Sequence, residues 1–128
     1  MKVLCIKLLN AHGRETSRSS RLTLGRTYQA LELMIDVSGC SSVRIVGDTE
    51  YGSKPTPTVH RLAQFEIIEN TMPQTWRVHR GNQGGMVFAP EPWQEDSFWV
   101  RFFDGEPAAV ASFEAERAKM YDVDPPVS

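Results

Sequence analysis

The chain has 128 residues, 41% of them hydrophobic, with 14 basic and 16 acidic side chains and a formal net charge of −2. This length predicts one domain that buries a core without disulfide bonds or a metal, and so small a net charge does not by itself indicate a nucleic-acid or membrane partner. The apolar segments are too short to span a bilayer, and the two cysteines are far apart in sequence with no signal peptide before them, so we expect a cytoplasmic protein with reduced thiols.

The first half of the chain predicts short strands joined by polar turns. Loosely alternating apolar residues favour a strand over residues 1–9, and the polar stretch 11–20 has no periodicity and is typical of a loop. Extended segments are predicted over 28–35 and 43–48. The glycine and the prolines between 48 and 57 predict an irregular loop.

The second half predicts strands followed by helix. A strand is expected over 62–69, and the segments 76–80 and 85–89 flank a glycine-rich stretch that is typical of a β-hairpin. Residues 93–103 predict a short helix or turn. Residues 106–121 are rich in alanine and carry apolar side chains at three- and four-residue spacing, which predicts a helix with one apolar face.

An aromatic block over residues 98–103 lies directly before this helix. Asp104 is expected to cap the first turn of the helix, and Pro107 is expected to lie within that turn. The aromatic side chains of the block are therefore expected to form the underside of a helical cap.

The order of these elements predicts the architecture. Five or six short strands followed by helix indicate a mainly β, α+β fold, built as a small, strongly bent antiparallel sheet or partly open barrel with a C-terminal helical cap. We expect a single domain over 1–128, with the barrel over 1–92, the cap over 93–121 and a flexible tail over 122–128.

Residue types that support catalysis are present without a recognisable pattern. His12, His60 and His79 are scattered and lack metal-ligand spacing, so no metal site and no cofactor are expected. Cys5 lies in an apolar run, where burial raises the pKa of a thiol and makes it inert. We therefore expect a protein that is not an enzyme, since a small hydrolase would need a cleft that gathers His60 or His79 with an acid.

The three tryptophans, Trp76, Trp93 and Trp99, have the largest burial potential and are expected to pack the barrel against the cap. Trp93 lies among prolines and acids, and we expect it to be partly exposed. An exposed tryptophan with acidic neighbours is typical of a hot spot in a protein interface.

Two stretches of the chain resemble a known family. Leu22-Thr-Leu-Gly-Arg-Thr-Tyr-Gln-Ala-Leu31 and Arg61-Leu-Ala-Gln-Phe-Glu-Ile-Ile68 are similar to the opening and closing strands of small bacterial SH3-like barrels. Arg26 stands where lysine is usual and Ala30 where valine is usual. The block over 89–109 resembles the C-terminal extension of small bacterial proteins, some of which are immunity proteins for polymorphic or secreted toxins. The resemblance implies an SH3-like barrel and transfers no catalytic residue.

Together these features favour a protein-binding module, specifically an immunity protein that neutralises a cognate bacterial toxin by covering its active site. Acidic side chains of the module would pair with a basic substrate-binding cleft of the toxin. The expected partner-binding residues lie around the turn that joins barrel to cap and in the 48–57 loop: Glu91, Trp93, Glu95, Asp96 and Asp104, with Asp48, Glu50 and Tyr51 as a second surface.

A nucleic-acid-binding or regulatory module is the alternative. Residues 1–30 hold six basic side chains and one acid. Arg14, Arg18, Arg21 and Arg26 lie among serines and threonines, a composition suited to binding phosphates, although binders of single strands usually add exposed aromatic side chains.

Overall fold

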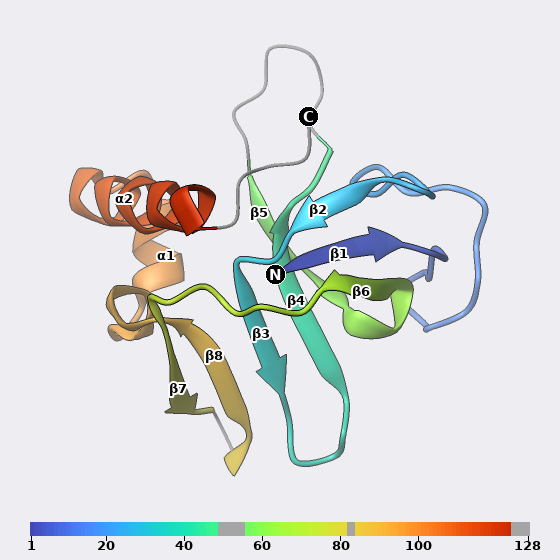
Figure 1. Ribbon diagram of the computed structural model, residues 1–128, viewed down its shortest axis with the longest axis horizontal. Coiled ribbons are helices and arrows are strands. Elements are labelled where there is room, and N and C mark those ends of the chain that lie inside the picture. The colour runs from blue at the N-terminus through green and yellow to red at the C-terminus, as the bar shows by residue number, and fades with distance from the viewer. Residues whose placement is uncertain (49–55, 82–83, 124–128) are drawn as a thin grey trace.

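The structure is a computed structural model that describes residues 1–48, 56–81 and 84–123. In these ranges the strands form two antiparallel sheets, one of three strands and one of five (Figure 1). The three-stranded sheet has the spatial order β2 (Thr27–Gln29), β1 (Lys2–Cys5), β6 (Phe65–Glu69). The five-stranded sheet has the spatial order β5 (Pro57–Arg61), β4 (Ser41–Val46), β3 (Glu32–Ile35), β8 (Met86–Pro90), β7 (Trp76–Arg80).

Helical segments connect the sheets and follow them. The described ones are the 3-10 helices η1 (Leu62–Gln64) and η3 (Glu91–Gln94) and the α-helices α1 (Phe98–Phe103) and α2 (Pro107–Val123). The predicted mainly β, α+β fold with a C-terminal helix is confirmed. The predicted barrel is not confirmed, because the two sheets stay separate in the part of the chain that the structure describes.

Each face of the five-stranded sheet is covered over part of its area. Arg44 of β4 lies opposite Val59 of β5, so Arg44 and His60 point to opposite faces. On the Arg44 face lies α1, whose Trp99 ring centre is 3.7 Å from the guanidinium carbon of Arg44. On the His60 face lies the three-stranded sheet, whose Phe65 ring centre is 6.5 Å from that of His60. The described residues therefore form three layers, with the five-stranded sheet in the middle.

Burial follows this layering. The β1 side chains Val3 and Cys5 are buried while their neighbours are less so, which is the two-residue period of a strand packed on one face. Val43 and Ile45 of β4 are completely buried in the core between the two sheets.

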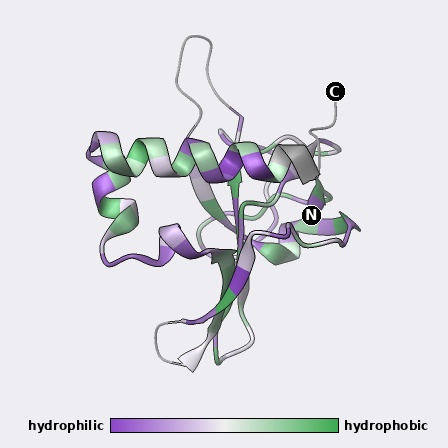
Figure 2. Cartoon of the chain, turned by 60° about the vertical axis from the view of Figure 1, so that its left-hand side comes forward, coloured by the Kyte–Doolittle hydropathy of each residue, from purple (hydrophilic) through white to green (hydrophobic). Residues whose placement is uncertain are grey.

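The long helix α2 packs against α1 and η3, and it carries both polar and apolar residues along its length (Figure 2). It starts at Pro107, and the carbonyl of Glu106 accepts a hydrogen bond from the Val110 N–H, so the helix and its first-turn proline are predicted correctly. The prediction that Asp104 caps the first turn of α2 is wrong, because Asp104 lies at the C-terminal end of α1. No helix in the described ranges is long and apolar enough to cross a membrane.

The hairpin expected in the second half is confirmed as β7 and β8, paired from Trp76 opposite Pro90 to Arg80 opposite Met86. Strand β5 was not expected, because its first residue is a proline that follows a predicted loop. Pro57 is tolerated there since it begins an edge strand. Residues 49–55 of the predicted loop and 124–128 of the predicted tail lie outside the described residues.

Candidate functional site: an acidic rim beside an aromatic cap

Aromatic rings from η3, α1 and α2 form one cluster at the base of the cap. Trp93 is at its centre, with ring centres 5.3 Å from Phe113, 5.5 Å from Trp99 and 6.4 Å from Phe98. Phe102 lies 4.8 Å from Phe113. These contacts combine large apolar burial with stacked and edge-to-face geometry, so they hold the segment 91–106 firmly against α2.

Trp93 is only 2% exposed, so its predicted role as an exposed anchor for a partner is wrong. Pro92 supports the 3-10 turn of η3, and that turn directs the Trp93 ring inward against Phe113. Phe113 lies twenty positions further along the chain, and no local pattern around Trp93 indicates this contact. Trp99 is the most exposed of the three tryptophans.

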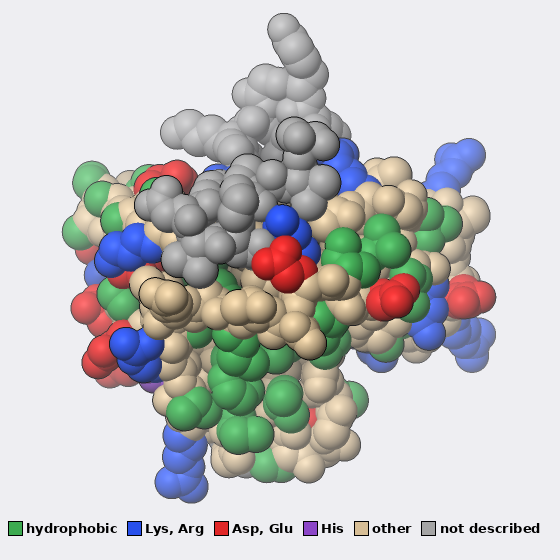
Figure 3. All heavy atoms as spheres, in the orientation of Figure 1, with side chains coloured by type: hydrophobic (Ala, Val, Ile, Leu, Met, Phe, Trp, Pro, Cys, Tyr) green, Lys and Arg blue, Asp and Glu red, His purple; other side chains and the backbone are tan. Residues whose placement is uncertain are grey.

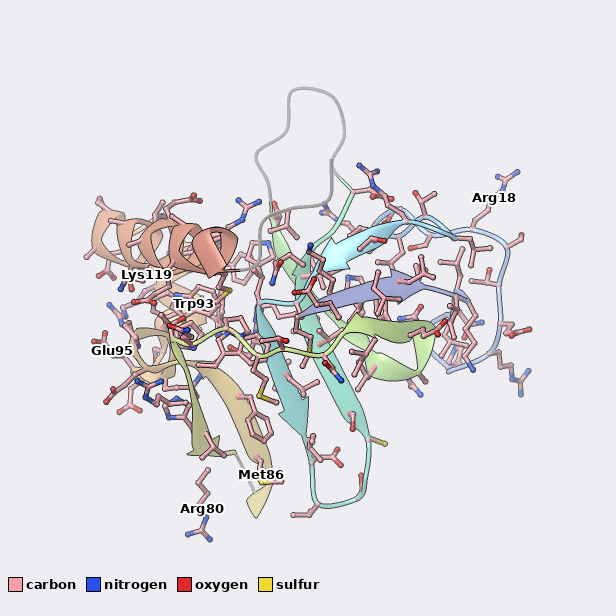
Figure 4. The ribbon with its side chains drawn as sticks, in the orientation of Figure 1. Arg18, Arg80, Met86, Trp93, Glu95 and Lys119 are labelled. Atoms are coloured by element: carbon pink, nitrogen blue, oxygen red, sulfur yellow. The ribbon has the colours of Figure 1, made fainter. Side chains whose placement is uncertain are left out.

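Carboxylates surround this cluster on the outside of the molecule. We call them the acidic rim: Glu91, Glu95, Asp96, Asp104 and Glu106. The segment that carries them holds one base, Arg101. In Figure 4 Glu95 lies at the outer margin of the molecule, whereas Trp93 lies inside it. The four predicted acids of this segment are all exposed and lie on one short stretch of chain.

Arg101 orders one part of the acidic rim. Its guanidinium donates hydrogen bonds to Glu95 at 3.1 Å and to Glu106 at 3.2 Å, which raises the pKa of Arg101. Ser97, between the two partners of this bridge, has a left-handed φ of 59° that turns the chain from η3 into α1. None of the described residues forms an ion pair with Glu91, Asp96 or Asp104, so these carboxylates are available to a partner.

Asp48, a predicted partner-binding residue, accepts three hydrogen bonds within the molecule. It accepts hydrogen bonds from the Thr23 hydroxyl at 2.6 Å, from Arg26 at 2.9 Å and from the Tyr28 hydroxyl at 2.9 Å. Burial is the main cause that raises the pKa of Tyr28 to about 12, and the Asp48 carboxylate adds to it. Asp48 therefore ties β2 to the end of β4. The other two residues of this predicted surface, Glu50 and Tyr51, lie outside the described residues.

A buried ion pair between β3 and β4 was not predicted. Glu32 is 3% and Arg44 is 9% exposed, and the Arg44 Nε lies 3.7 Å from a Glu32 carboxylate oxygen. Burial raises the pKa of Glu32 and lowers that of Arg44, while each partner opposes the shift of the other. Alternation with apolar neighbours suggests a solvent-facing position for both residues. The helical cap buries the face of the five-stranded sheet that carries both residues, and the Trp99 ring covers Arg44.

The histidines do not converge. The Nε2 of His60 on β5 is hydrogen-bonded to the Thr58 hydroxyl at 2.7 Å, and the Nε2 of His79 on β7 lies 3.2 Å from the Ala89 carbonyl oxygen. These strands are at opposite edges of the five-stranded sheet. The ranges that the structure describes contain no group of three or more His, Cys, Asp or Glu residues able to hold a metal.

Cys5 and Cys40 are both free thiols. Cys5 is buried, and burial raises the pKa of its thiol, as its apolar setting predicts. Cys40 is exposed in the turn between β3 and β4.

The basic segment lies on the opposite side of the molecule from the acidic rim, where Figure 4 shows Arg18 projecting outward. An open depression of about 390 Å³ is lined there by Leu8, Ser17, Arg18, Ser19, Leu22, Thr23 and Leu24. Arg26 is paired with Asp48 at 2.9 Å, which partly neutralises it. Arg14, Arg18 and Arg21 carry the remaining positive charge of the predicted set.

Comparison with protein-family models, with curated proteins and with solved structures finds no match to this chain. The functional interpretation therefore depends on its own residues and geometry.

Proposed function

We propose that this chain is a non-enzymatic protein-binding module, and that its role is that of a cytoplasmic immunity protein which covers the active site of a cognate bacterial toxin. The observation that supports the proposal is the acidic rim, in which Glu91, Asp96 and Asp104 have no ion-pair partner among the described residues. The resemblance of the block over 89–109 to the C-terminal extension of small bacterial proteins, some of which are immunity proteins, points to the same role.

The rim is well suited to a basic surface. Its charges lie on a short segment that the Trp93 cluster holds in place, so little ordering entropy opposes binding. A toxin that acts on an anionic substrate needs a basic cleft, and complementary charge accelerates and orients the encounter with such a cleft. An immunity protein needs no reacting groups of its own, because it acts by occupying the site.

The test starts from the gene next to this one in the native genome. The neighbouring protein is expressed in a bacterial host alone and together with this chain, and growth is measured. We expect growth arrest alone and rescue on co-expression. Reversing two rim charges that have no ion-pair partner among the described residues, Asp96→Lys with Asp104→Lys, should weaken rescue and lower the affinity of the purified pair by tenfold or more, roughly the scale of losing two charge pairs.

A matched control carries the same charge change elsewhere. Glu114→Lys with Glu66→Lys alters two exposed acids outside the rim and should leave rescue unchanged. Equal loss with the control pair would show a general charge effect and contradict a role for the rim. If the neighbouring protein is harmless and affinity purification from the native host recovers no protein partner, the immunity proposal is wrong.

Nucleic-acid binding through Arg14, Arg18, Arg21 and Arg26 is the alternative proposal. The depression lined by Arg18, Ser17, Ser19 and Thr23 supports it, because a guanidinium beside hydroxyl groups suits a phosphate. Such binding should weaken steeply as salt rises, since each phosphate contact releases counterions. A mobility-shift assay at low salt that detects no complex with single- or double-stranded probes would reject it.

A further inference from the structure

The outer edge of β7 is an open hydrogen-bonding edge at Val78 and Arg80, whereas the Trp76 carbonyl accepts a hydrogen bond from the Arg77 guanidinium at 2.9 Å. In the described residues β7 pairs with β8 alone and is the last strand of its sheet. The Gly81 N–H donates a hydrogen bond to the Gly85 carbonyl at 2.7 Å, so these two residues form a hydrogen-bonded pair at the end of the ladder between β7 and β8. Hydrogen-bonded and non-hydrogen-bonded pairs alternate along an antiparallel ladder. Counting back from Gly81, the backbone N–H and C=O groups of Arg77 and His79 therefore face β8, and those of Val78 and Arg80 point away from it.

Apolar side chains approach this edge on one face of the sheet. One cross-strand row runs from Leu33 through Phe88 to Val78, and the exposed fraction rises along it to 62% at Val78. The next row runs from Ile35 through Met86, which is 46% exposed, to Arg80. Figure 3 shows apolar side chains gathered over the lower part of the molecule, where Figure 1 places β3, β4 and β8.

We propose that the β7 edge binds an extended acidic segment of a partner protein, which adds as a further strand beside β7 and covers the end of the apolar rows. Strand addition of this kind takes its affinity from backbone hydrogen bonds and its specificity from alternate side chains. The binding edge is distinct from the acidic rim, so the proposal does not depend on the immunity role.

The basic side chains of β7 indicate that the bound strand is acidic. β7 carries Arg77, His79 and Arg80, and its neighbour β8 carries no charged residue. Figure 4 shows Arg80 projecting from the end of β7 into open space. A second copy pairing through its own β7 would bring arginines together, and like charges facing each other across strands are destabilising. An acidic strand instead places a carboxylate beside each guanidinium.

The register also predicts the side-chain pattern of the occupant. Val78 and Arg80 point to the same face because they are two positions apart in a strand. The incoming strand should therefore place an apolar residue beside Val78 and an acid beside Arg80, also two positions apart. A second acid, placed one position from the apolar residue of the incoming strand, would point to the other face of the sheet and lie near Arg77.

Selection from a random-peptide display library against the full-length protein tests the proposal. We expect enriched peptides with an apolar residue and an acid two positions apart. Val78→Pro removes the outward N–H and leaves the β8 ladder intact, since proline is tolerated where the N–H faces solvent. It should weaken binding of an enriched peptide about tenfold or more, whereas the control Val78→Thr keeps the N–H and should bind as the parent does.

Two further measurements keep the test decisive if Val78→Pro fails to fold. Arg80→Glu should reduce binding of the same peptide, and the peptide should slow hydrogen exchange of the Val78 and Arg80 amides in the unaltered protein. Absence of acidic enrichment, equal binding to a folded Val78→Pro variant, or unchanged exchange at these amides would overturn the proposal. Self-association that Val78→Pro abolishes would overturn it in favour of a second copy. Asp96→Lys with Asp104→Lys should leave peptide binding unchanged, which separates this test from that of the acidic rim.

Discussion

The buried pair of Glu32 and Arg44 is the clearest case of a residue-scale feature that connects two layers of the molecule. Both side chains lie between the five-stranded sheet and α1, and Arg44 also packs against the Trp99 ring. Removing two charges from water is costly, so such a pair stabilises the fold only while both partners are present. The pair therefore specifies how α1 sits on the sheet.

We expect Glu32→Gln to lower the free energy of unfolding by about 3 kcal/mol, because it leaves the Arg44 charge buried without a counter-ion. The double variant Glu32→Leu, Arg44→Met should recover much of this loss, since a thioether still packs on the Trp99 ring. Urea unfolding followed by circular dichroism measures both. Glu66→Gln alters an exposed acid of β6 and serves as the control. A double variant less stable than Glu32→Gln would contradict this account.

Tyr28 provides a prediction for high pH. Its hydroxyl donates to Asp48 and its pKa is raised to about 12 from the ordinary value of 10.0, chiefly by burial. The folded protein therefore holds this proton more tightly than the unfolded chain does. The resulting stabilisation is complete below the unfolded pKa and is lost as pH rises from about 10 through 12.

Tyrosinate absorbance during a base titration should show one late-titrating tyrosine among the three in the chain. Tyr28→Phe should remove that late step and flatten the fall in stability over the same pH range. If all tyrosines of the folded parent titrate together at the ordinary value, the burial argument for Tyr28 is wrong.

At the scale of elements, the packing of β8 against β3 depends on a glycine. Gly85 directly precedes β8, and a Cβ at this position would overlap the Ile35 carbonyl oxygen and lie 2.9 Å from the Asp36 Cα. Both neighbours are backbone atoms that cannot move without disturbing β3. The glycine thus permits the close approach that brings the hairpin into the sheet.

Gly85→Ala should therefore destabilise the protein by about 2 kcal/mol or more, in the range of other overpacking substitutions. Gly39→Ala is a matched comparison, because Gly39 has a φ of +87° but open space around its Cα, and strain alone should cost about 1 kcal/mol. Thermal unfolding of both variants measures the difference. A Gly85→Ala variant more stable than Gly39→Ala would show that the β3–β8 contact can relax.

Elements with a local signal were predictable and those that depend on distant contacts were not. The glycines around position 83 and the alternation on either side identify the β7–β8 hairpin, and alanines identify α2. Strand β5 was missed, because edge position, which makes Pro57 acceptable, is a property of the assembled sheet. The sequence around Asp104 predicts the start of α2 although Asp104 ends α1, because α2 begins only three residues later, at Pro107.

At the scale of the whole molecule, the same distinction applies to the candidate site. Exposure of Glu91, Glu95, Asp96 and Asp104 agrees with their charge, whereas burial of Trp93 depends on α2 folding back over η3. The ion pair of Glu32 and Arg44 was missed for a related reason. Strand alternation indicates which residues share a face but not whether a helix later covers that face.

The cap and the sheets share one core, so they should unfold together. Trp93→Ala is expected to lower the global free energy of unfolding by about 3–5 kcal/mol, the usual cost of deleting a large buried aromatic side chain. Phe103→Ala removes an aromatic ring from the same block that is 54% exposed, and should cost much less. Coincident transitions by near- and far-ultraviolet circular dichroism are expected for both variants. A separate early transition in Trp93→Ala would show that the cap unfolds independently.

The position of β1 has a consequence for how the protein is made. β1 lies in the centre of its sheet, with β2 on one side and β6 on the other, and Val3 lies opposite both Tyr28 and Ile67. During synthesis, β1 keeps its apolar side chains and one whole hydrogen-bonding edge exposed until residues 65–69 have also emerged from the ribosome. At typical elongation rates of about 5–20 residues per second, this interval lasts several seconds. The pairing of β1 is thus completed late, and the nascent protein depends on the polar loop after β1 and on pairing with β2 to remain unaggregated.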